Sequence, residues 1–487
     1  MTVTNSFSIP FKSLFTCVLA FVLCTQVKGQ EIVGAEKYTQ IPLESFSFFK
    51  KPSDKWKIAG GVSFGLNATY KNNVTDGTGK VVHTTAGKET DYLSSANEFG
   101  DMSVEFNFML AQGASATVYF QGRYGISLTD SWTKGKSGTD VCGTVLENAD
   151  GPTSMVTPAR MNVCRAPGLW QHMQVMFRAP RFDKQNNKIG HAAFARVTLN
   201  GVVIYENLGL SGPSKNSPLA GEAATGALIF ASNSVMALKD IRYMIPPNGD
   251  FASLIKPEAG TNIRDRPIIV SPLGKTIVQR CFIEFEGKKK TFCTAVGNPQ
   301  GVHYAMDLSQ GAMINFWKGG FIDATSMWTD RGEYQVAKPV GSKIEVRPVP
   351  TFAMLHDANE PWPDVAGDTF RFKGYKLAAD GNPTFMYRVG DMQLEDSFLP
   401  KERDNSLTRS LKITSGKISN NLWLRLAEGA SITSLGNDLY VIGDNQYYIK
   451  LVGDKKLKPV IRKSANGQEL ILSGSVLDHD FNYTLIW

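Results

Sequence analysis

The chain has 487 residues, of which 42% are hydrophobic and 20% are charged. These values match ordinary globular proteins, so they argue against a disordered, collagen-like, coiled-coil or polytopic membrane protein and predict two to four packed domains. The formal net charge of +7 comes from 52 basic and 45 acidic residues, with no dense basic run. A nucleic-acid partner is therefore not indicated. The 45 Gly, the 23 Pro and the many short Val-, Ile-, Phe- and Tyr-rich runs favour β-structure.

The first 29 residues have the pattern of a secretory signal peptide. Lys12 precedes an apolar stretch at residues 14–27, and Gly29 ends a segment that suits cleavage. The apolar stretch is too short for a membrane-spanning helix. We therefore expect a secreted or periplasmic protein with no membrane span after the signal is removed.

Four cysteines would remain in the mature chain, and an exported protein is expected to use them in two disulfides. Three connectivities are possible. Residues 281–293 have the pattern of a hairpin turning near Gly287, with a cysteine at each end. This pattern favours the pairs Cys281–Cys293 and Cys142–Cys164. A zinc site is the alternative, but none of the four lies in a Cys-x-x-Cys pair and no histidine is near them in sequence.

The first half of the chain has the pattern of antiparallel strands. In residues 102–110 apolar and polar side chains alternate, as on a strand with one buried face. Asn200 and Gly201 separate two short apolar runs and predict a type I′ hairpin turn, because both residues tolerate positive φ. Several such strands favour an antiparallel sandwich.

The polar faces of the expected strands are candidates for a shallow binding groove. Planar amides, an arginine, a tyrosine and a tryptophan are groups that hydrogen-bond sugar hydroxyls and stack on pyranose rings. An ordinary solvated face is the alternative, and alternation alone does not separate the two. The side chains on these faces are Glu105, Asn107, Thr117, Tyr119, Gln121, Arg123, Ser127, Thr129, Trp170, His172 and Gln174.

The second half continues with strand-length, aromatic-rich runs. Residues 248–267 are rich in Pro and Gly and form the expected domain boundary. Residues 370–375 and 383–389 are expected to pair in a hairpin turned at Asp380-Gly381. The expected domains are a signal at 1–29, a sandwich at 30–257, and a β-rich region at 258–487 that is either one sandwich or two divided near 350–365. The predicted fold class is all-β.

An ordered set of motifs in the first half carries a resemblance to a known family. The motifs are Phe120-Gln-Gly-Arg-Tyr124, Asp130-Ser131, Cys142-Gly143, Asn162, Cys164-Arg-Ala-Pro-Gly168, Trp170-Gln171, Arg178-Ala-Pro-Arg-Phe-Asp183, Asn200-Gly201 and Leu238-Lys-Asp-Ile-Arg242. With these motifs the chain resembles the 3-keto-disaccharide hydrolase-like family over roughly residues 46–247. The resemblance implies a concanavalin-like jelly-roll sandwich in an exported bacterial protein that acts on oxidised glycosides.

The resemblance also implies a reaction, cleavage of 3-keto-glycosides. A ketone at sugar C3 acidifies the proton at C2, so that a base can remove this proton while the aglycone leaves from C1. Water then adds back, or the glycal is released. Such a site needs a carboxylate or imidazole at the proton and a cation or donors at the enolate oxygen. The family's common pattern has an acid after its Arg-Tyr pair, whereas this chain has Gly125 there.

Glycine can neither take a proton nor bind a metal, so other side chains must supply the chemistry if the protein is an enzyme. The catalytic candidates are Glu105, Asp130 and His172, and the substrate-binding candidates are Asn107, Tyr119, Gln121, Arg123 and Trp170. Each also has a structural interpretation, such as a turn cap for Asp130. No cofactor is evident, and a divalent metal is an open option. The alternative function is a non-catalytic carbohydrate-binding or assembly protein.

Parts of the second half are similar to β-domains appended to secreted bacterial cytochromes and sugar-dehydrogenase-like proteins. The similarity rests on Gly301-Val-His303, residues 317–323 and Phe372-Lys-Gly-Tyr375. No Cys-x-x-Cys-His motif is present, so no covalent haem is expected. A polar and aromatic set could line a second site, although core and turn roles are favoured. Its members are His303, Asp307, Asp323, Trp328 and Arg331.

Overall fold

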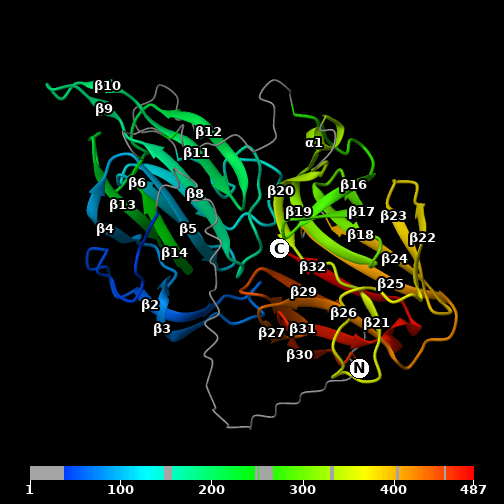
Figure 1. Cartoon of the computed structure of the whole chain (residues 1–487). Helices are drawn as coiled ribbons and strands as arrows, with labels where there is room; N and C mark the ends of the chain where they lie inside the picture. The colour runs from blue at the N-terminus through cyan, green and yellow to red at the C-terminus, as the bar shows by residue number, and fades with distance from the viewer. Residues whose placement is uncertain are drawn as a thin grey trace, which may run out of the picture. The chain divides into compact units, whose positions relative to one another are not determined.

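The computed structural model describes residues 38–146, 156–246, 251, 267–329, 334–401, 405–453 and 457–487. In these ranges the regular secondary structure is almost entirely β-strand, with one short helix, α1 (Thr325–Thr329), and a 3-10 turn at Gly474–Asp478 (Figure 1). The all-β prediction is confirmed. No helix in the described ranges is long and apolar enough to cross a membrane. The expected signal peptide and nearly all of the expected boundary at 248–267 lie outside the described residues.

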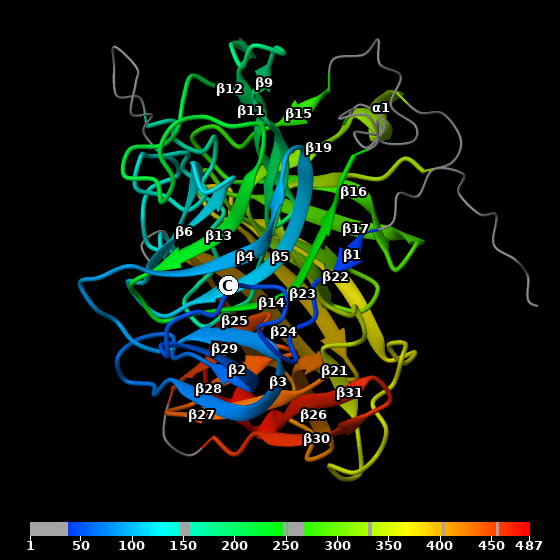
Figure 2. The ribbon, with the colours of Figure 1, turned by 90° about the vertical axis from the view of Figure 1, so that its left-hand side faces the viewer.

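The first half forms two antiparallel sheets, and Figure 2 turns them towards the viewer. The larger sheet has the order β12-β11-β8-β5-β14-β3-β2, with β1 paired to β14. Its strands are β1 (Thr39–Gln40), β2 (Trp56–Ser63), β3 (Asn73–His83), β5 (Met102–Leu110), β8 (Gln171–Arg178), β11 (Ala192–Leu199), β12 (Val202–Leu210) and β14 (Met236–Met244). The smaller sheet, in order, consists of β4 (Asp91–Phe99), β13 (Gly226–Ser232), β6 (Ser115–Phe120) and β7 (Tyr124–Thr129). A separate hairpin pairs β9 (Arg181–Phe182) with β10 (Lys188–Gly190).

The inner faces of these two sheets share one apolar core. Phe106 of the larger sheet lies edge-on against Phe230 of the smaller, with ring centroids 5.1 Å apart, and Phe120 lies 5.3 Å from Phe177. The side chains that the alternation assigned to the buried faces are in this core: Met102, Val104, Phe106, Phe108, Leu110, Tyr124, Ile126, Leu128, Met173, Val175 and Phe177. Burial of such rings is the main source of stability in a sandwich. The buried faces of the predicted strands are confirmed, but β5 has no solvated face, because Ser103 and Met109 on its other side are 0% exposed.

Three predicted hairpins are also confirmed. Asn200 and Gly201 have φ of 51° and 81° and connect β11 to β12, as a type I′ turn requires. The turn at Gly287, with φ of 71°, connects β16 (Ile277–Phe285) to β17 (Lys288–Gly297). Gly381, with φ of 84°, lies in the turn between β22 (Phe370–Leu377) and β23 (Pro383–Val389).

The second half forms three antiparallel sheets. The first contains β15 (Ile269–Val270), β16, β17, β18 (Val302–Asp307), β19 (Ala312–Asp323) and β20 (Lys338–Glu345). The second has the order β21 (Phe352–Met354), β26 (Leu422–Gly429), β31 (Gly467–Ser473) and β30 (Val460–Ser464). The third has the order β22, β23, β24 (Met392–Lys401), β25 (Ser406–Ser415), β32 (Phe481–Ile486), β29 (Tyr447–Val452), β28 (Leu439–Ile442) and β27 (Ile432–Gly436).

One apolar cluster receives side chains from all three of these sheets, including Phe316 of β19, Leu424 of β26 and Tyr483 of β32. Phe316 lies 4.7 Å from the C-terminal Trp487, ring centroid to ring centroid. Among the described residues no sheet takes strands from both halves of the chain. The halves meet instead through loops, where the Tyr448 hydroxyl donates to the Pro167 carbonyl at 2.9 Å.

Candidate functional site

The predicted site residues belong to two different sheets. Glu105 lies on β5 and His172 on β8, in the larger sheet, whereas Tyr119 lies on β6 and Asp130 follows β7, in the smaller sheet. The outer faces of two sheets packed face to face point in opposite directions. The structure therefore does not bring these residues into one groove. Alternation separates inward from outward side chains, but it does not assign a strand to a sheet.

Glu105 is bound on both carboxylate oxygens. Gln174 Nε2 donates to Oε1 at 2.7 Å and Arg242 Nε donates to Oε2 at 2.6 Å. Arg242 also covers the ring of Tyr38, with its guanidinium carbon 5.0 Å from the centroid. Glu105 is only 7% exposed. Both oxygens of this carboxylate are therefore hydrogen-bonded, and Glu105 does not lie on the ordinary solvated face that was the alternative to a binding groove.

His172 belongs to a neighbouring row of polar side chains. Its Nδ1 lies 3.0 Å from Asn107 Oδ1, and Asn107 Nδ2 donates to Asp240 Oδ2 at 2.8 Å. Since an amide oxygen only accepts, this contact assigns the hydrogen to His172 Nδ1 and leaves Nε2 as the acceptor. Desolvation by the surrounding side chains lowers the pKa of His172. The imidazole is a base on the outer face of the larger sheet.

Asp130, Arg123 and Gln121 hold loops at the ends of the smaller sheet. Asp130 Oδ2 accepts from the Gly113 amide at 2.8 Å and its Oδ1 from the Trp132 amide at 3.2 Å, which is the turn-cap role. Arg123 donates to backbone carbonyls, including that of Gln121 at 2.8 Å. Gln121 was expected on an outward face, but it is 1% exposed and donates to the Ala224 carbonyl at 2.8 Å. The turn after β6 reverses its side chain, since Gln121 has φ of 54°.

Trp170 lies where the two halves of the chain meet. It is 6% exposed, its backbone amide donates to the Asn445 carbonyl at 3.1 Å, and the Lys239 ammonium lies 4.6 Å from its ring centroid. Lys239 in turn pairs with Asp444. The indole therefore packs in a contact between halves and does not line a groove on either outer face.

Gly125 has no room for the acid of the family pattern. It is the cross-strand partner of Tyr119. A Cβ at Gly125 would lie 2.8 Å from Tyr119 Cε1, 2.8 Å from Leu146 Cδ1 and 3.1 Å from Thr117 Cγ2. The tyrosine ring and the leucine methyl group occupy the space in which a side chain of residue 125 would stand.

A groove of about 260 Å³ crosses the outer face of the smaller sheet beside this position. Ala231 is in register with Tyr92 on one side and Thr117 on the other. Because its side chain is small, the surface is lower at Ala231 than at these two neighbours, and this forms the bottom of the groove. Tyr92 is 45% exposed. The lining of this smaller-sheet groove is Thr90, Tyr92, Ser115, Ala116, Thr117, Tyr119, Asn216, Ala231, Ser232 and Asn233. None of these side chains is a carboxylate, an imidazole or a cation.

Sequence reasoning found Thr117 and Tyr119 but missed most of this groove. Tyr92 carried a usable signal, because it is a large aromatic residue at an outward position of a strand. Asn216 and Asn233 lie in loops outside the strands, so no periodic pattern marks them.

The four described cysteines carry free, buried thiols in the structure. The favoured pairs are nevertheless neighbours. Cys281 and Cys293 face each other across β16 and β17, and Cys142 and Cys164 interact directly. The contact with Cys142 lowers the pKa of Cys164 to about 7. The two disulfides therefore stay predictions.

The predicted second-site set of the C-terminal half does not form one cluster. His303 is 1% exposed, its Nδ1 accepts from the Asn298 amide and its Nε2 donates to the Gly319 carbonyl, each at 3.0 Å. Desolvation lowers the pKa of His303 to about 4. Asp323 accepts from the Thr325 amide at the start of α1 at 2.8 Å. Arg331 lies outside the described residues, and in the described part no three His, Cys, Asp or Glu side chains are grouped to hold a metal ion.

The first half is thus a two-sheet antiparallel sandwich of the jelly-roll class. Residues 48–243 match the model of a family described as a 3-keto-alpha-glucoside-1,2-lyase-like domain. The resemblance expected over roughly residues 46–247 is confirmed. The match does not reach the second half, whose similarity to domains of secreted cytochromes stays an expectation.

Comparison with solved structures gives distant likenesses. A candidate glycosyl hydrolase from Parabacteroides distasonis is 16% identical over 44% of this chain and 95% of its own, with a TM-score of 0.27. The carbohydrate binding module CBM66 from Bacillus subtilis is 8% identical over 39% and 96%, with a TM-score of 0.23. The Bacillus licheniformis β-glucanase is 9% identical over 44% and 100%, with a TM-score of 0.25. No curated protein matches the chain.

Proposed function

We propose that this protein binds carbohydrate in the smaller-sheet groove. The observation that carries the proposal is the lining of the groove, which combines hydroxyl groups, two carboxamides and two tyrosines on a rigid sheet. Hydroxyls and carboxamides both donate and accept hydrogen bonds, as sugar hydroxyls require, and a tyrosine ring offers an apolar face to a pyranose. The family match supports the same ligand class.

Binding without cleavage fits the groove better than catalysis. Removal of a proton from C2 needs a base within hydrogen-bond reach, and the described lining offers none. Tyr119 and Leu146 fill the place next to Gly125. Glu147, which directly follows Leu146 in the chain, lies outside the described residues. A 3-keto-glycoside outside the cytoplasm is the ligand we propose, from the family description and the expected signal peptide.

Calorimetric titration of the purified protein with 3-keto-trehalose and with trehalose tests this function. We expect binding, with about threefold to tenfold weaker affinity in Tyr92→Ala because a ring contact of about 0.5–1.5 kcal/mol is lost. Tyr375→Ala is the matched control, since Tyr375 is exposed to a similar extent, 42% against 45%, on a strand of the second half. Absence of heat with both sugars and with a wider glycan panel would reject the proposal.

The family description supports a second candidate function, cleavage of 3-keto-glycosides. Product formation from 3-keto-trehalose, with and without divalent metal, measures it directly. Because Glu105 and Asp130 belong to opposite sheets, the single variants Glu105→Ala and Asp130→Ala indicate on which side the reaction occurs. Equal product from the wild type and from the double variant Glu105→Ala, Asp130→Ala would exclude these two carboxylates as the catalytic base. The variant Glu147→Ala then tests whether Glu147 is that base.

A further inference from the structure

A cavity of about 430 Å³ lies in the second half, within the range of about 300–1,000 Å³ that is usual for small-molecule sites. Its wall is formed by β26, by the hairpin of β30 and β31, and by residues 347–364. We call it the charge-ladder cavity. Its lining is Arg347, Val349, Asn359, Glu360, Pro361, Trp362, Pro363, Asp364, Arg425, Glu428, Arg462, Lys463, Ser464, Ala465, Asn466 and Glu469.

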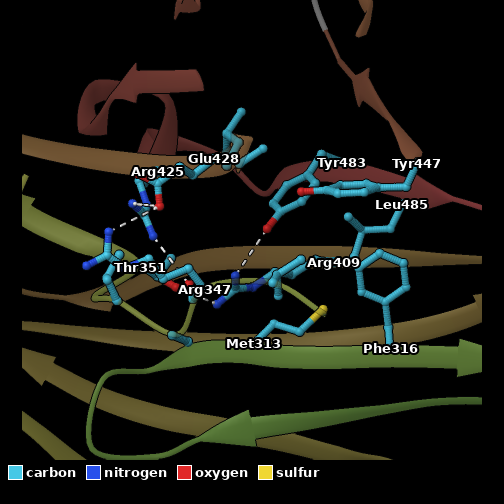
Figure 3. A pocket seen from close by; sticks show the side chains of 15 residues that line it. Met313, Phe316, Arg347, Thr351, Arg409, Arg425, Glu428, Tyr447, Tyr483 and Leu485 are labelled. Carbon is cyan, nitrogen blue, oxygen red and sulfur yellow. Dashed lines mark hydrogen bonds and ion pairs between the residues drawn. The ribbon is translucent and has the colours of Figure 1, made fainter. Parts of the chain in front are cut away.

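Six charged side chains of opposite sign alternate along this wall. Going along the row, the nitrogen–oxygen distances are 3.0 Å for Asp364–Arg347, 3.9 Å for Arg347–Glu428, 3.2 Å for Glu428–Arg425, 3.7 Å for Arg425–Glu469 and 2.8 Å for Glu469–Arg462. Figure 3, which draws the lining of a smaller neighbouring hollow, shows three of them, Arg347, Arg425 and Glu428, close together on one side of it. The row is a fixed array of donors and acceptors.

The middle of the row is almost removed from solvent. The side chains of Arg425, Glu428 and Glu469 are 8%, 7% and 2% exposed. Removing charges from water costs several kcal/mol for each ion, and well-packed apolar residues often stabilise a core equally well. A buried row of charges beside an open cavity is therefore poorly explained by stability alone.

One acceptor in the row has no hydrogen-bond donor. Both Nε and Nη2 of Arg462 lie 2.8 Å from Glu469 Oε1, whereas Glu469 Oε2 is buried and accepts no hydrogen bond. The nearest guanidinium contact of Oε2 is Arg425 Nη1, at 3.7 Å. The charge of Glu469 is therefore balanced by Arg425 and Arg462 without a hydrogen bond to Oε2, and it fixes both guanidinium groups at the cavity wall.

Trp362 supplies an apolar wall between charged neighbours. Its indole Nε1 donates to the Pro350 carbonyl at 2.8 Å, which fixes the ring. The guanidinium carbons of Arg425 and Arg462 lie 6.0 and 5.9 Å from its centroid. An indole beside rigid planar donors is the combination that a sugar ring with apolar and polar faces requires.

A second, smaller hollow shares part of the lining of this cavity. Arg347, Arg425 and Glu428 also line a hollow of about 50 Å³ that leads to Arg409. Arg409 donates to Asp396 Oδ2 at 2.7 Å. It also donates to the Tyr483 hydroxyl at 3.1 Å, the contact that Figure 3 shows. A buried ion pair therefore lies behind the shared residues Arg347, Arg425 and Glu428.

The charge balance selects the ligand class. Four cations and four anions line the cavity, namely Arg347, Arg425, Arg462 and Lys463 against Glu360, Asp364, Glu428 and Glu469. A charged ligand would leave a net charge in a partly desolvated site, whereas hydroxyl groups can donate to the carboxylates and accept from the guanidinium groups. We propose that the charge-ladder cavity is a second carbohydrate site, specific for an uncharged saccharide. It does not depend on the smaller-sheet groove.

Saturation-transfer NMR and calorimetry on the purified full-length protein test this site. The probes are trehalose, cellobiose, maltose and sucrose, with glucuronate and inorganic phosphate as charged competitors. We expect at least one uncharged disaccharide to bind to Tyr92→Ala as well as to the wild type, because Tyr92 belongs to the other groove. Binding to neither protein, or tighter binding of glucuronate or phosphate, would overturn the proposal.

Variants locate the site. Glu469→Gln should weaken this binding about tenfold, since the carboxylate that holds Arg425 and Arg462 in place at the cavity wall is lost. Glu469 is buried, so folding is checked by circular dichroism, and the exposed rim variants Lys463→Ala and Asn466→Ala keep the test valid if Glu469→Gln misfolds. Binding that all three variants leave unchanged would refute the assignment. Loss of binding only in Tyr92→Ala would place the sugar in the smaller-sheet groove instead.

Discussion

The two halves of this protein place their polar groups differently. In the first half, the smaller-sheet groove lies on an outer face and is lined by neutral side chains. In the second half, the charge-ladder cavity is lined largely by arginines and carboxylates, several of them buried. The comparison shows that two β-rich halves of one chain can line a hollow with neutral side chains in one case and with a fixed array of charges in the other.

The largest effect, on the free energy of unfolding, is expected from breaking the buried Arg409–Asp396 pair of the second half. Arg409→Leu leaves Asp396, which is 0% exposed, as a buried charge without a partner. We expect a loss of about 3–5 kcal/mol in the free energy of unfolding, measured by denaturant titration. The double variant Asp396→Leu, Arg409→Leu should regain most of it. Equal stability of the single variant and the wild type would show that the pair is not enclosed as described.

The buried His303 predicts a pH-dependent stability. Its pKa is lowered by desolvation to about 4 in the folded protein, against about 6.5 when unfolded. As the pH falls, the unfolded chain therefore takes up this proton before the folded protein does. The contribution of His303 to the free energy of unfolding, about 3 kcal/mol, is complete above about pH 6.5 and is lost as the pH falls towards 4. Denaturant titrations of the wild type and of His303→Gln across this pH range measure the contribution of His303. The other titrating groups are present in both proteins, so their effect cancels in the difference between the two unfolding free energies. Parallel stability curves would contradict the prediction.

The filled space at Gly125 predicts a packing cost in the first half. Gly125→Ala should destabilise the protein by about 1–3 kcal/mol, because its Cβ overlaps the Tyr119 ring and the Leu146 methyl group. In a Tyr119→Ala background the same change should cost clearly less, since the ring is gone. Thermal unfolding of the three variants measures this coupling. Additive costs would mean that the ring does not occupy the position.

The smallest effect is expected from a change of pH on ligand affinity in the smaller-sheet groove. Its lining has no carboxylate, imidazole or amine, and burial raises the pKa of Tyr119 above its ordinary value, so this phenol stays protonated. Affinity for 3-keto-trehalose should therefore be constant within about twofold between about pH 5 and 8. Calorimetric titrations at several pH values check this, and a bell-shaped dependence would indicate an ionisable group at the ligand.

Much of the local structure was predictable from sequence. Alternation assigned Phe106 and Phe177 to a buried face, and the Asn200-Gly201 pair marked its hairpin, because side-chain period and turn chemistry are local properties. The candidate site was less predictable. Glu105 and Tyr119 were combined in one groove although they lie on opposite sheets, since the order of strands is set by contacts between distant segments.

The sequence by itself determined the all-β fold, the hairpins, the resemblance of residues 48–243 to a known family and the absence of an acid at Gly125. Only the tertiary structure decided what that absence means, because the Tyr119 ring and Leu146 fill the space beside the glycine. It also brought together Arg347, Arg425 and Glu469, which come from separate strands and loops. The physical reason is that turns and alternation depend on neighbours in sequence, whereas a binding site depends on which distant side chains share a desolvated space.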